Sequence, residues 1–304
     1  MNKFIKYLCL YFPLILIGIS LIGSAVIFSN QTFNIGSSKI IDANLSAQLG
    51  NLYGGFIGTI LSASSVFLLI YTIFHQKIET QKNSLEINFF KMLDYHNQHL
   101  NYICIPHLNP EKGLVEGKRA FIQFKIQFKN ILEITKTVLS KNDLSFSDQQ
   151  LADISYIIFY YGIEGSWTNF IYNKCKKYDF ISLNLVKEIQ EELIAKGQKK
   201  FVRANQTYLS SYFRNMYNAI KMIDESKLLD SQEKKDLIKI YRAQFSNPEL
   251  YILFFNILSR FGKKWIENKY IERYELIKNI PHDYCDGYDP KKYFTTIKFE
   301  EDEY

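Results

Sequence analysis

The chain has 304 residues, of which 47% are hydrophobic and 22% charged, and its formal net charge is +6. This composition excludes an intrinsically disordered chain, and the length allows one or two domains with a substantial core. The positive charge is too small to indicate nucleic-acid binding by itself, because domains attached to membranes are often basic too.

Two apolar runs near the N-terminus predict a membrane hairpin. Residues 7–28 and 52–74 contain no Asp, Glu, Lys or Arg, and each is long enough as a helix to cross the roughly 30 Å hydrocarbon core of a bilayer. Basic residues precede the first run, as in a cleaved signal peptide, but this run is longer than a usual signal sequence and a second span follows closely. We therefore expect residues 1–76 to form a transmembrane hairpin.

The lysines that flank the two runs indicate an orientation. Lys3 and Lys6 precede the first run and three lysines follow the second, whereas the intervening loop, residues 29–50, has only Lys39. The three lysines after the second run are Lys77, Lys82 and Lys91. Because basic flanks stay in the cytoplasm, we expect both termini there, with residues 77–304 as a cytoplasmic domain.

Small residues recur four apart in the second run. Gly54, Gly58 and Ser62 lie on one helical face, and such faces let two helix backbones approach closely. This face packs either against the first run of the same chain or against a second copy in a homo-oligomer, and the sequence leaves both interpretations open.

The rest of the chain has the periodicity of helices. Apolar residues three and four apart, together with caps such as Ser147, Ser182 and Asp230, predict helices at 84–103, 118–139, 147–161, 182–197, 203–224 and 230–241. Within 118–139, alternate apolar residues also fit a strand, but the length favours a helix. From about residue 281 we expect an irregular tail with a short strand at 293–299. The predicted fold class is thus all-α: a two-helix transmembrane hairpin followed by an α-helical cytoplasmic domain.

Residues 242–250 read RAQFSNPEL and predict the start of another helix. Ser246 and Glu249 have the spacing of a capping box, and the intervening proline fits the first helical turn. This helix is predicted to end at Phe261, with Gly262 closing it in the left-handed conformation. Capping leaves Arg242 and Gln244 unexplained.

The same segment resembles the signature of the "putative phage abortive infection" family, the AbiC-like membrane proteins of bacteria. The matching positions in YRAQFSNPELYILFFN are Tyr241, Arg242, Ala243, Gln244, Ser246, Glu249, Leu250 and Asn256. YFRNMY, at 212–217, is similar to a second family element, and the similarity covers most of the chain from about residue 50. Where many relatives have a His upstream of Tyr212, this chain has Asn205 and Gln206. The resemblance implies anti-phage defence at a bacterial inner membrane and supplies no reaction.

The sequence shows no complete catalytic or metal-binding motif. His96 and His99 lie about one helical turn apart without the further ligands that zinc needs, so we expect no metal and a packed His96. No Arg is followed by a His at the spacing found in small helical ribonucleases. The four cysteines lack the spacing of redox or metal motifs and are predicted to be free thiols, and no cofactor is expected.

Five polar residues in and near the signature are the candidate site: Arg214, Arg242, Gln244, Glu249 and Asn256. They form either a buried polar network that joins successive helices or a pocket for an anionic or peptidic trigger.

The functional expectation is defence by abortive infection, through a membrane-anchored effector or sensor. Its expected partners are the lipid bilayer, a second copy of the chain through the spans, and a phage-derived protein or nucleic acid as trigger. Two alternatives remain: a membrane-tethered nuclease or hydrolase, and a membrane-anchored binding module without toxic activity. A non-enzymatic role is favoured because no reactive set of side chains is apparent.

Overall fold

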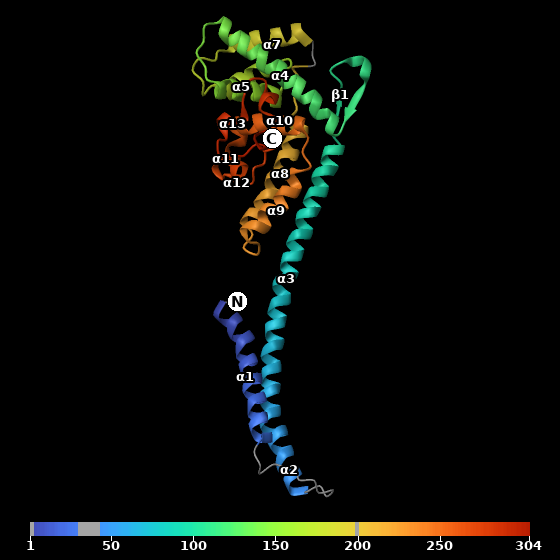
Figure 1. Cartoon of the computed structure of the whole chain (residues 1–304). Helices are drawn as coiled ribbons and strands as arrows, with labels where there is room; N and C mark the ends of the chain where they lie inside the picture. The colour runs from blue at the N-terminus through green and yellow to red at the C-terminus, as the bar shows by residue number, and fades with distance from the viewer. Residues whose placement is uncertain (1–2, 30–42, 198–200) are drawn as a thin grey trace. The chain divides into compact units, whose positions relative to one another are not determined.

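The computed structural model describes residues 3–29, 43–197 and 201–304. The chain divides into two compact units, Met1–Glu86 and Ile87–Tyr304, here called the N-terminal and C-terminal units. Helices make up nearly all of the regular structure in both (Figure 1), which confirms the predicted all-α class. The boundary predicted at residue 76 and the division at residue 86 both fall within one helix, α3 (Gly58–Asn101).

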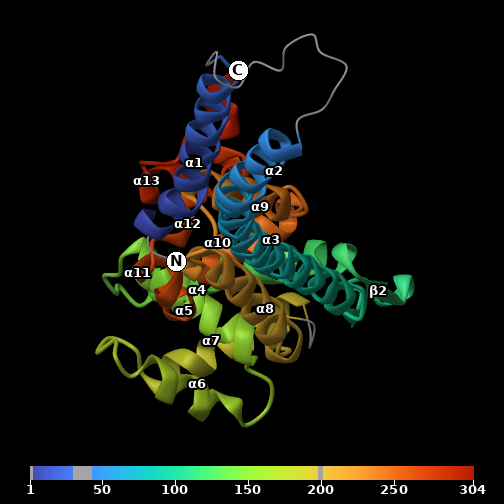
Figure 2. The same ribbon diagram turned by 90° about the horizontal axis from the view of Figure 1, so that it is seen from below.

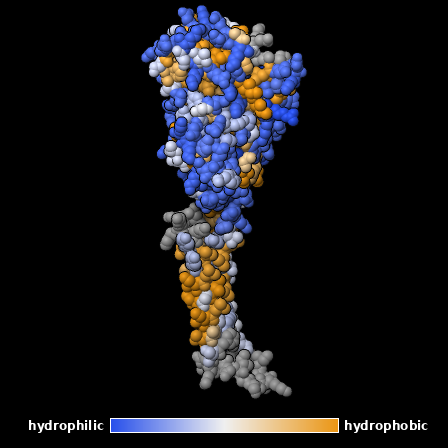
Figure 3. Space-filling view, turned by 45° about the horizontal axis from the view of Figure 1, so that its top comes forward, coloured by the Kyte–Doolittle hydropathy of each residue, from blue (hydrophilic) through white to orange (hydrophobic). Residues whose placement is uncertain are grey.

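The N-terminal unit contains the two predicted apolar helices. It consists of α1 (Lys3–Ser29), α2 (Ala43–Asn51), a π-helical segment (Leu52–Ile57) and the first part of α3. Two of its helices are long and apolar enough to cross a membrane, and only 17% and 11% of their most apolar windows are buried by the protein. A core helix of a soluble protein would be mostly buried, and Figure 3 shows these helices as an apolar surface. The predicted loop between them lies largely at 30–42, with Lys39, outside the described residues.

Within the described residues, the small-residue face of the second apolar helix is largely uncovered. Gly54 and Ser62 are exposed, and a Cβ added at Gly54 would meet no atom within 4 Å. A Cβ at Gly58 would meet the Tyr53 carbonyl oxygen of its own helix, at 3.3 Å. The contact with α1 uses a different part of α3, where the Phe67 ring packs edge-on against a phenylalanine of α1. Among the described residues α1 leaves this face open, and we carry packing against another copy forward as a proposal.

A short β-hairpin opens the C-terminal unit. Strands β1 (Cys104–Pro106) and β2 (Leu114–Glu116) pair antiparallel, with a short 3₁₀ turn (Pro110–Lys112) between them. The sequence analysis did not predict this hairpin, because three-residue strands are too short to show alternation. Gly113 and Gly117 have φ of 69° and 58°, a conformation that glycine adopts without strain, and they mark the ends of β2.

Helix α4 (Lys118–Lys141) lies at the centre of this unit. It packs against α5 (Asp148–Tyr161), α7 (Leu183–Gly197) and α10 (Asn247–Leu258), while α6 (Trp167–Cys175) packs on α7 (Figure 2). The burial of its alternating apolar residues, which also fitted a strand, confirms that α4 is a helix. Phe124 and Phe128 are fully buried, whereas Ile122 and Ile126 are 46% and 41% exposed, so alternate residues do not share one face.

The capped helices confirm the sequence analysis. Capping boxes open α5 at Ser147 and α9 (Ser231–Arg242) at Asp230, and the Ser182 hydroxyl accepts the Leu185 N–H at the start of α7. Helix α8 (Gln206–Glu225) begins three residues later than predicted.

The end predicted for the signature helix is wrong. Helix α10 ends at Leu258, and Ser259, in an extended conformation, turns the chain into a short 3₁₀ segment (Arg260–Gly262). Gly262 has φ −88°, which is not left-handed. Glycine is required there for space, since a Cβ would lie 2.2 Å from the Ile257 Cα.

The C-terminal segment consists of short helices and 3₁₀ turns joined by irregular stretches, and it is packed on the core. After α11 (Lys263–Glu267) and α12 (Tyr270–Arg273) come a 3₁₀ turn (His282–Cys285), α13 (Pro290–Tyr293) and a last 3₁₀ turn (Glu300–Glu303). The strand predicted at 293–299 is wrong, because no neighbouring strand is available to pair with it among the described residues. Its apolar side chains instead pack into the core, with Phe299 fully buried.

Candidate functional site

The signature segment joins the end of α9 to α10 through a tight turn. Tyr241 and Arg242 end α9, Gln244 lies in the turn, and Ser246 precedes α10. Ser246 and Glu249 form the predicted capping box. The Ser246 hydroxyl also donates to Glu249 Oε2 at 2.6 Å, which turns the cap residue into a donor to the carboxylate.

The Glu249 carboxylate is the buried polar centre of this segment. Glu249 is 2% exposed, and its Oε2 accepts the Ser246 N–H at 2.8 Å. Its Oε1 accepts the hydroxyl of Tyr212, a fully buried residue of α8, at 2.7 Å. A carboxylate this buried is tolerable only because three donors replace water. Burial, followed by the nearby Glu249 charge, raises the pKa of Tyr212 well above its ordinary value, so Tyr212 remains a donor at neutral pH.

His96 of α3 packs against α8, the end of α9 and the turn that follows it. Its ring centroid is 4.3 Å from that of Tyr212, 5.4 Å from that of Tyr241 and 6.0 Å from that of Phe245. His96 is 2% exposed, and neither ring nitrogen has a hydrogen-bond partner among the described residues. Burial, then the charges of His99 and Lys118, lower its pKa to about 4. The imidazole is therefore neutral at pH 7, and we call Glu249, Tyr212, Tyr241 and His96 the Glu249 cluster.

The depressed pKa of His96 predicts acid sensitivity. The unfolded chain protonates this residue near pH 6.5 and the folded chain only near pH 4. Stability should therefore be lost as the pH falls through that window, by up to about 3 kcal/mol. His96→Leu should remove this part of the pH dependence, whereas the exposed His99→Leu should keep it. Thermal midpoints of the full-length variants between pH 7 and 4 measure the difference, and parallel curves for wild type and His96→Leu would contradict it.

Polar contacts of Gln244 and Arg242 link this turn to other elements of the C-terminal unit. Gln244 Oε1 accepts from the Asn97 amide of α3 at 3.1 Å, and its carbonyl accepts from the Lys118 ammonium at 2.6 Å. The Arg242 side chain is 12% exposed, and its Nη1 lies 3.1 Å from the Glu275 carbonyl and 3.4 Å from Glu275 Oε2. Arg242 also lines a hollow of about 290 Å³ of mixed charge.

The remaining two predicted residues lie elsewhere. Asn256 is 4% exposed near the end of α10 and donates to the Tyr156 hydroxyl of α5 at 2.9 Å. Arg214 is exposed on α8, and its side chain forms no hydrogen bond or ion pair within the part of the chain that the structure describes. The structure therefore links Glu249 to Tyr212, Gln244 to Asn97 and Arg242 to Glu275, and does not gather the five predicted residues into one cluster.

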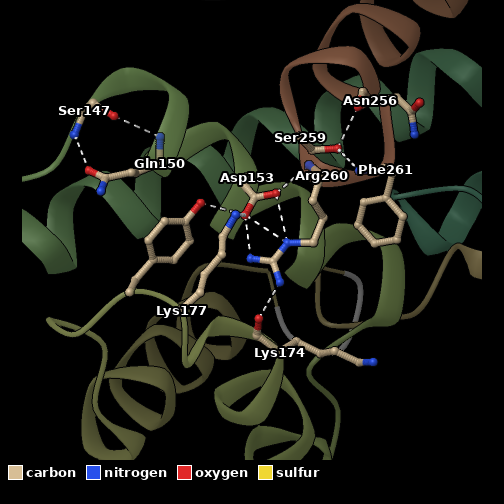
Figure 4. Close-up of polar contacts among 10 residues, drawn as sticks. Ser147, Gln150, Asp153, Lys174, Lys177, Asn256, Ser259, Arg260 and Phe261 are labelled. Carbon is tan, nitrogen blue, oxygen red and sulfur yellow. Dashed lines mark hydrogen bonds and ion pairs between the residues drawn. The ribbon is translucent and has the colours of Figure 1, made fainter. Parts of the chain in front are cut away.

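A second buried carboxylate was missed by the sequence analysis. Asp153 of α5 has a side chain that is 3% exposed, and it accepts hydrogen bonds from Arg260 Nε and Nη2 and from the Arg260 backbone N–H (Figure 4). Tyr178 donates to it at 2.8 Å, and the Lys177 ammonium lies 3.2 Å away. Although burial alone would raise it, these hydrogen bonds lower the pKa of Asp153. A lone acid inside the apolar run LADISYIIFYY was the available signal, since buried charges need partners.

The chemistry open to these groups is limited by their burial. The Glu249 cluster is closed to solvent, and within the described ranges no three His, Cys, Asp or Glu side chains are arranged to hold a metal ion. The cluster instead ties α3, α8, α9 and α10 together through short polar and aromatic contacts. Such an arrangement suits a conformational switch or a stabilising network better than a catalytic site.

Comparison with known proteins gives a family match that covers three of the four residues of the Glu249 cluster. The family model described as "Putative phage abortive infection protein" matches residues 204–284, which confirms the family resemblance over this segment. The comparisons with curated proteins and with solved structures each gave no match. Tyr212, Tyr241 and Glu249 lie inside the matched segment, and His96 and Asp153 lie outside it.

Proposed function

We propose that this protein defends a bacterium against phage by abortive infection, as a membrane-anchored sensor or effector. The observation that carries the proposal is the family match at 204–284, whose description suggests that role. The match falls on the elements from α8 to the turn at His282–Cys285, which bring Tyr212 into contact with Glu249. The length and apolar composition of the two N-terminal helices support the membrane anchor.

The proposed mechanism uses helix α3 and the Glu249 cluster. Helix α3 carries most of the second apolar run in its first part and His96 in its second. A phage-derived protein or nucleic acid that disturbs the cluster would release His96 from Tyr212 and Tyr241, and so change how α3 is held. Copies associated through the small-residue face would then damage the inner membrane or arrest the cell. Binding energy for the trigger must exceed the cost of opening this closed packing.

Phage challenge at low and high multiplicity tests this function. At low multiplicity, cells with the protein should survive as a population and give fewer plaques than cells with empty vector. At high multiplicity, the same cells should stop growing or lose membrane potential before new phage are released. Unchanged plaque numbers across a panel of diverse phages would contradict a defence role, and protection with full survival at high multiplicity would contradict abortive infection.

The proposed topology places both termini in the cytoplasm. A cytosolic reporter fused after Tyr304 should be active, and an exported reporter at the same position inactive, because lysines flank the outer ends of the two apolar runs. The same two reporters fused at Gly50, between the runs, provide the reverse control. A C-terminal fusion active outside the cytoplasm would contradict this orientation.

The small-residue face predicts an effect of added bulk on self-association. Gly58→Leu should weaken helix contacts between copies by about 1–2 kcal/mol. Ala63→Leu adds bulk at an exposed position of the same helix, rotated away from the face, and should leave association unchanged. Crosslinking of single-cysteine variants in membranes measures both. Equal crosslinking of wild type and Gly58→Leu would remove this face from the proposal and leave the defence role in place.

A further inference from the structure

A hollow of about 980 Å³ lies between the β-hairpin and the first turns of α4. Its basic side chains come from the hairpin turn (Lys112) and from the start of α4 (Lys118 and Arg119). Glu116 is the one acidic residue that lines it. The hollow therefore carries an excess of positive charge, which favours an anionic ligand.

Two of these cations have no protein partner in the part of the chain that the structure describes. The side chains of Lys112 and Arg119 are exposed and form no hydrogen bond or ion pair among the residues of the ranges described above. The Lys118 ammonium donates to the Gln244 carbonyl, a neutral acceptor that leaves its charge uncompensated. Three like charges around one hollow repel each other, and a bound anion would relieve that repulsion.

A largely buried glutamine adds an amide donor at the same place. Gln123 is 5% exposed and lines the hollow, and its Oε1 accepts the Leu108 N–H at 3.1 Å. The amide nitrogen of Gln123 has no acceptor in the described part of the chain. The amide N–H groups of Gln123, at the wall of the hollow, are therefore free to donate to an oxygen atom of a ligand.

The start of α4 adds to the positive field. Gly117 precedes the helix, no side chain caps its first turn, and that turn contains no acidic residue. Lys118 and Arg119 occupy positions where the helix dipole favours negative charge. The backbone thus favours the same kind of ligand as the side chains.

We propose that this hollow binds the phosphate of a nucleotide, either free or within a nucleic-acid strand. The volume exceeds what a phosphate alone needs, and exposed Leu114 and Ile122 (66% and 46%) line it with apolar surface on which a base can lie. Arginine and lysine hold phosphate oxygens, and the Gln123 amide donates one further hydrogen bond. This binding is independent of the defence role and is measured on purified protein.

Fluorescence anisotropy of a short labelled single-stranded RNA tests the proposal, with the full chain in zwitterionic nanodiscs. Arg119→Glu should weaken binding by about tenfold or more, and raised salt should weaken it further. Lys136→Glu makes the same change of net charge at an exposed position of α4 that does not line the hollow, and should change affinity less than about twofold. Lys112→Glu, in the hairpin turn, repeats the test if Arg119→Glu lowers the thermal midpoint.

Competition identifies the source of the phosphate. Displacement of the RNA by a mononucleotide at similar concentration assigns a free nucleotide, and displacement only by unlabelled strand assigns nucleic acid; either result supports the proposal. Absence of binding by RNA and mononucleotide at low salt would overturn it. So would equal losses in Arg119→Glu and Lys136→Glu, or displacement of the RNA by anionic vesicles, which would assign the surface to lipid.

Discussion

Replacing Asp153 with alanine is expected to lower the free energy of unfolding by about 3–5 kcal/mol. The carboxylate is 3% exposed and accepts two side-chain hydrogen bonds from Arg260, at 2.6 and 3.0 Å to Oδ2. Its removal leaves the guanidinium, itself 29% exposed, without its acid partner and the Tyr178 hydroxyl without its acceptor. Most of this cost comes from the unpaired donors of Arg260 and Tyr178, which stay buried away from water. The lost attraction between the two charges contributes less.

The thermal midpoint of the full-length protein in detergent measures this loss. Asp179→Ala removes the same atoms from an exposed carboxylate near Tyr178 and should cost less than about 0.5 kcal/mol. Arg260→Ala should cost less in the Asp153→Ala background than in wild type, because the two residues share one interaction. Equal midpoints for Asp153→Ala and Asp179→Ala would show that the cluster in Figure 4 contributes no stability.

Local signals predicted the helices well because their causes are local. The boxes that open α5, α9 and α10 join residues three apart, so the sequence contains both partners within one turn. The buried face of α4 likewise follows from spacing, once Ile122 and Ile126 are assigned to solvent. Errors arose where the cause lies far along the chain. The C-terminal strand predicted at 293–299 had no partner strand, which only the fold could reveal.

The candidate site shows the same limit. The sequence placed Glu249 in a polar set with Arg242 and Asn256, its neighbours along the chain. In the fold these three side chains take partners from different elements, and the carboxylate meets Tyr212, 37 positions earlier. Sequence proximity identified residues with buried polar roles but not which of them touch. Asp153 was missed because its partner Arg260 is 107 positions away.

The largest expected effect on function comes from removing the Tyr212 hydroxyl. Tyr212→Phe keeps the aromatic packing against His96 and deletes the hydroxyl that donates to Glu249 Oε1. A hydrogen bond to a charged group is worth about 1.5–3 kcal/mol, so the variant should be destabilised yet folded at low temperature. Tyr156→Phe is the matched control, since it deletes another fully buried hydroxyl, which accepts from the Asn256 amide.

Protection against phage, compared at equal fractions of folded protein, shows whether the Tyr212–Glu249 bond only stabilises the fold or also transmits the response to infection. If the Glu249 cluster transmits the response to infection, Tyr212→Phe should give plaque numbers close to those of empty vector, while Tyr156→Phe still protects. The amounts of both variants in purified membranes and their thermal midpoints establish that they are folded at the temperature of the challenge. If protection instead follows the folded fraction in both variants, the Tyr212–Glu249 bond only stabilises the fold. The response to infection must then enter the C-terminal unit elsewhere, because a group that only stabilises a fold lowers activity no further than it lowers the folded population.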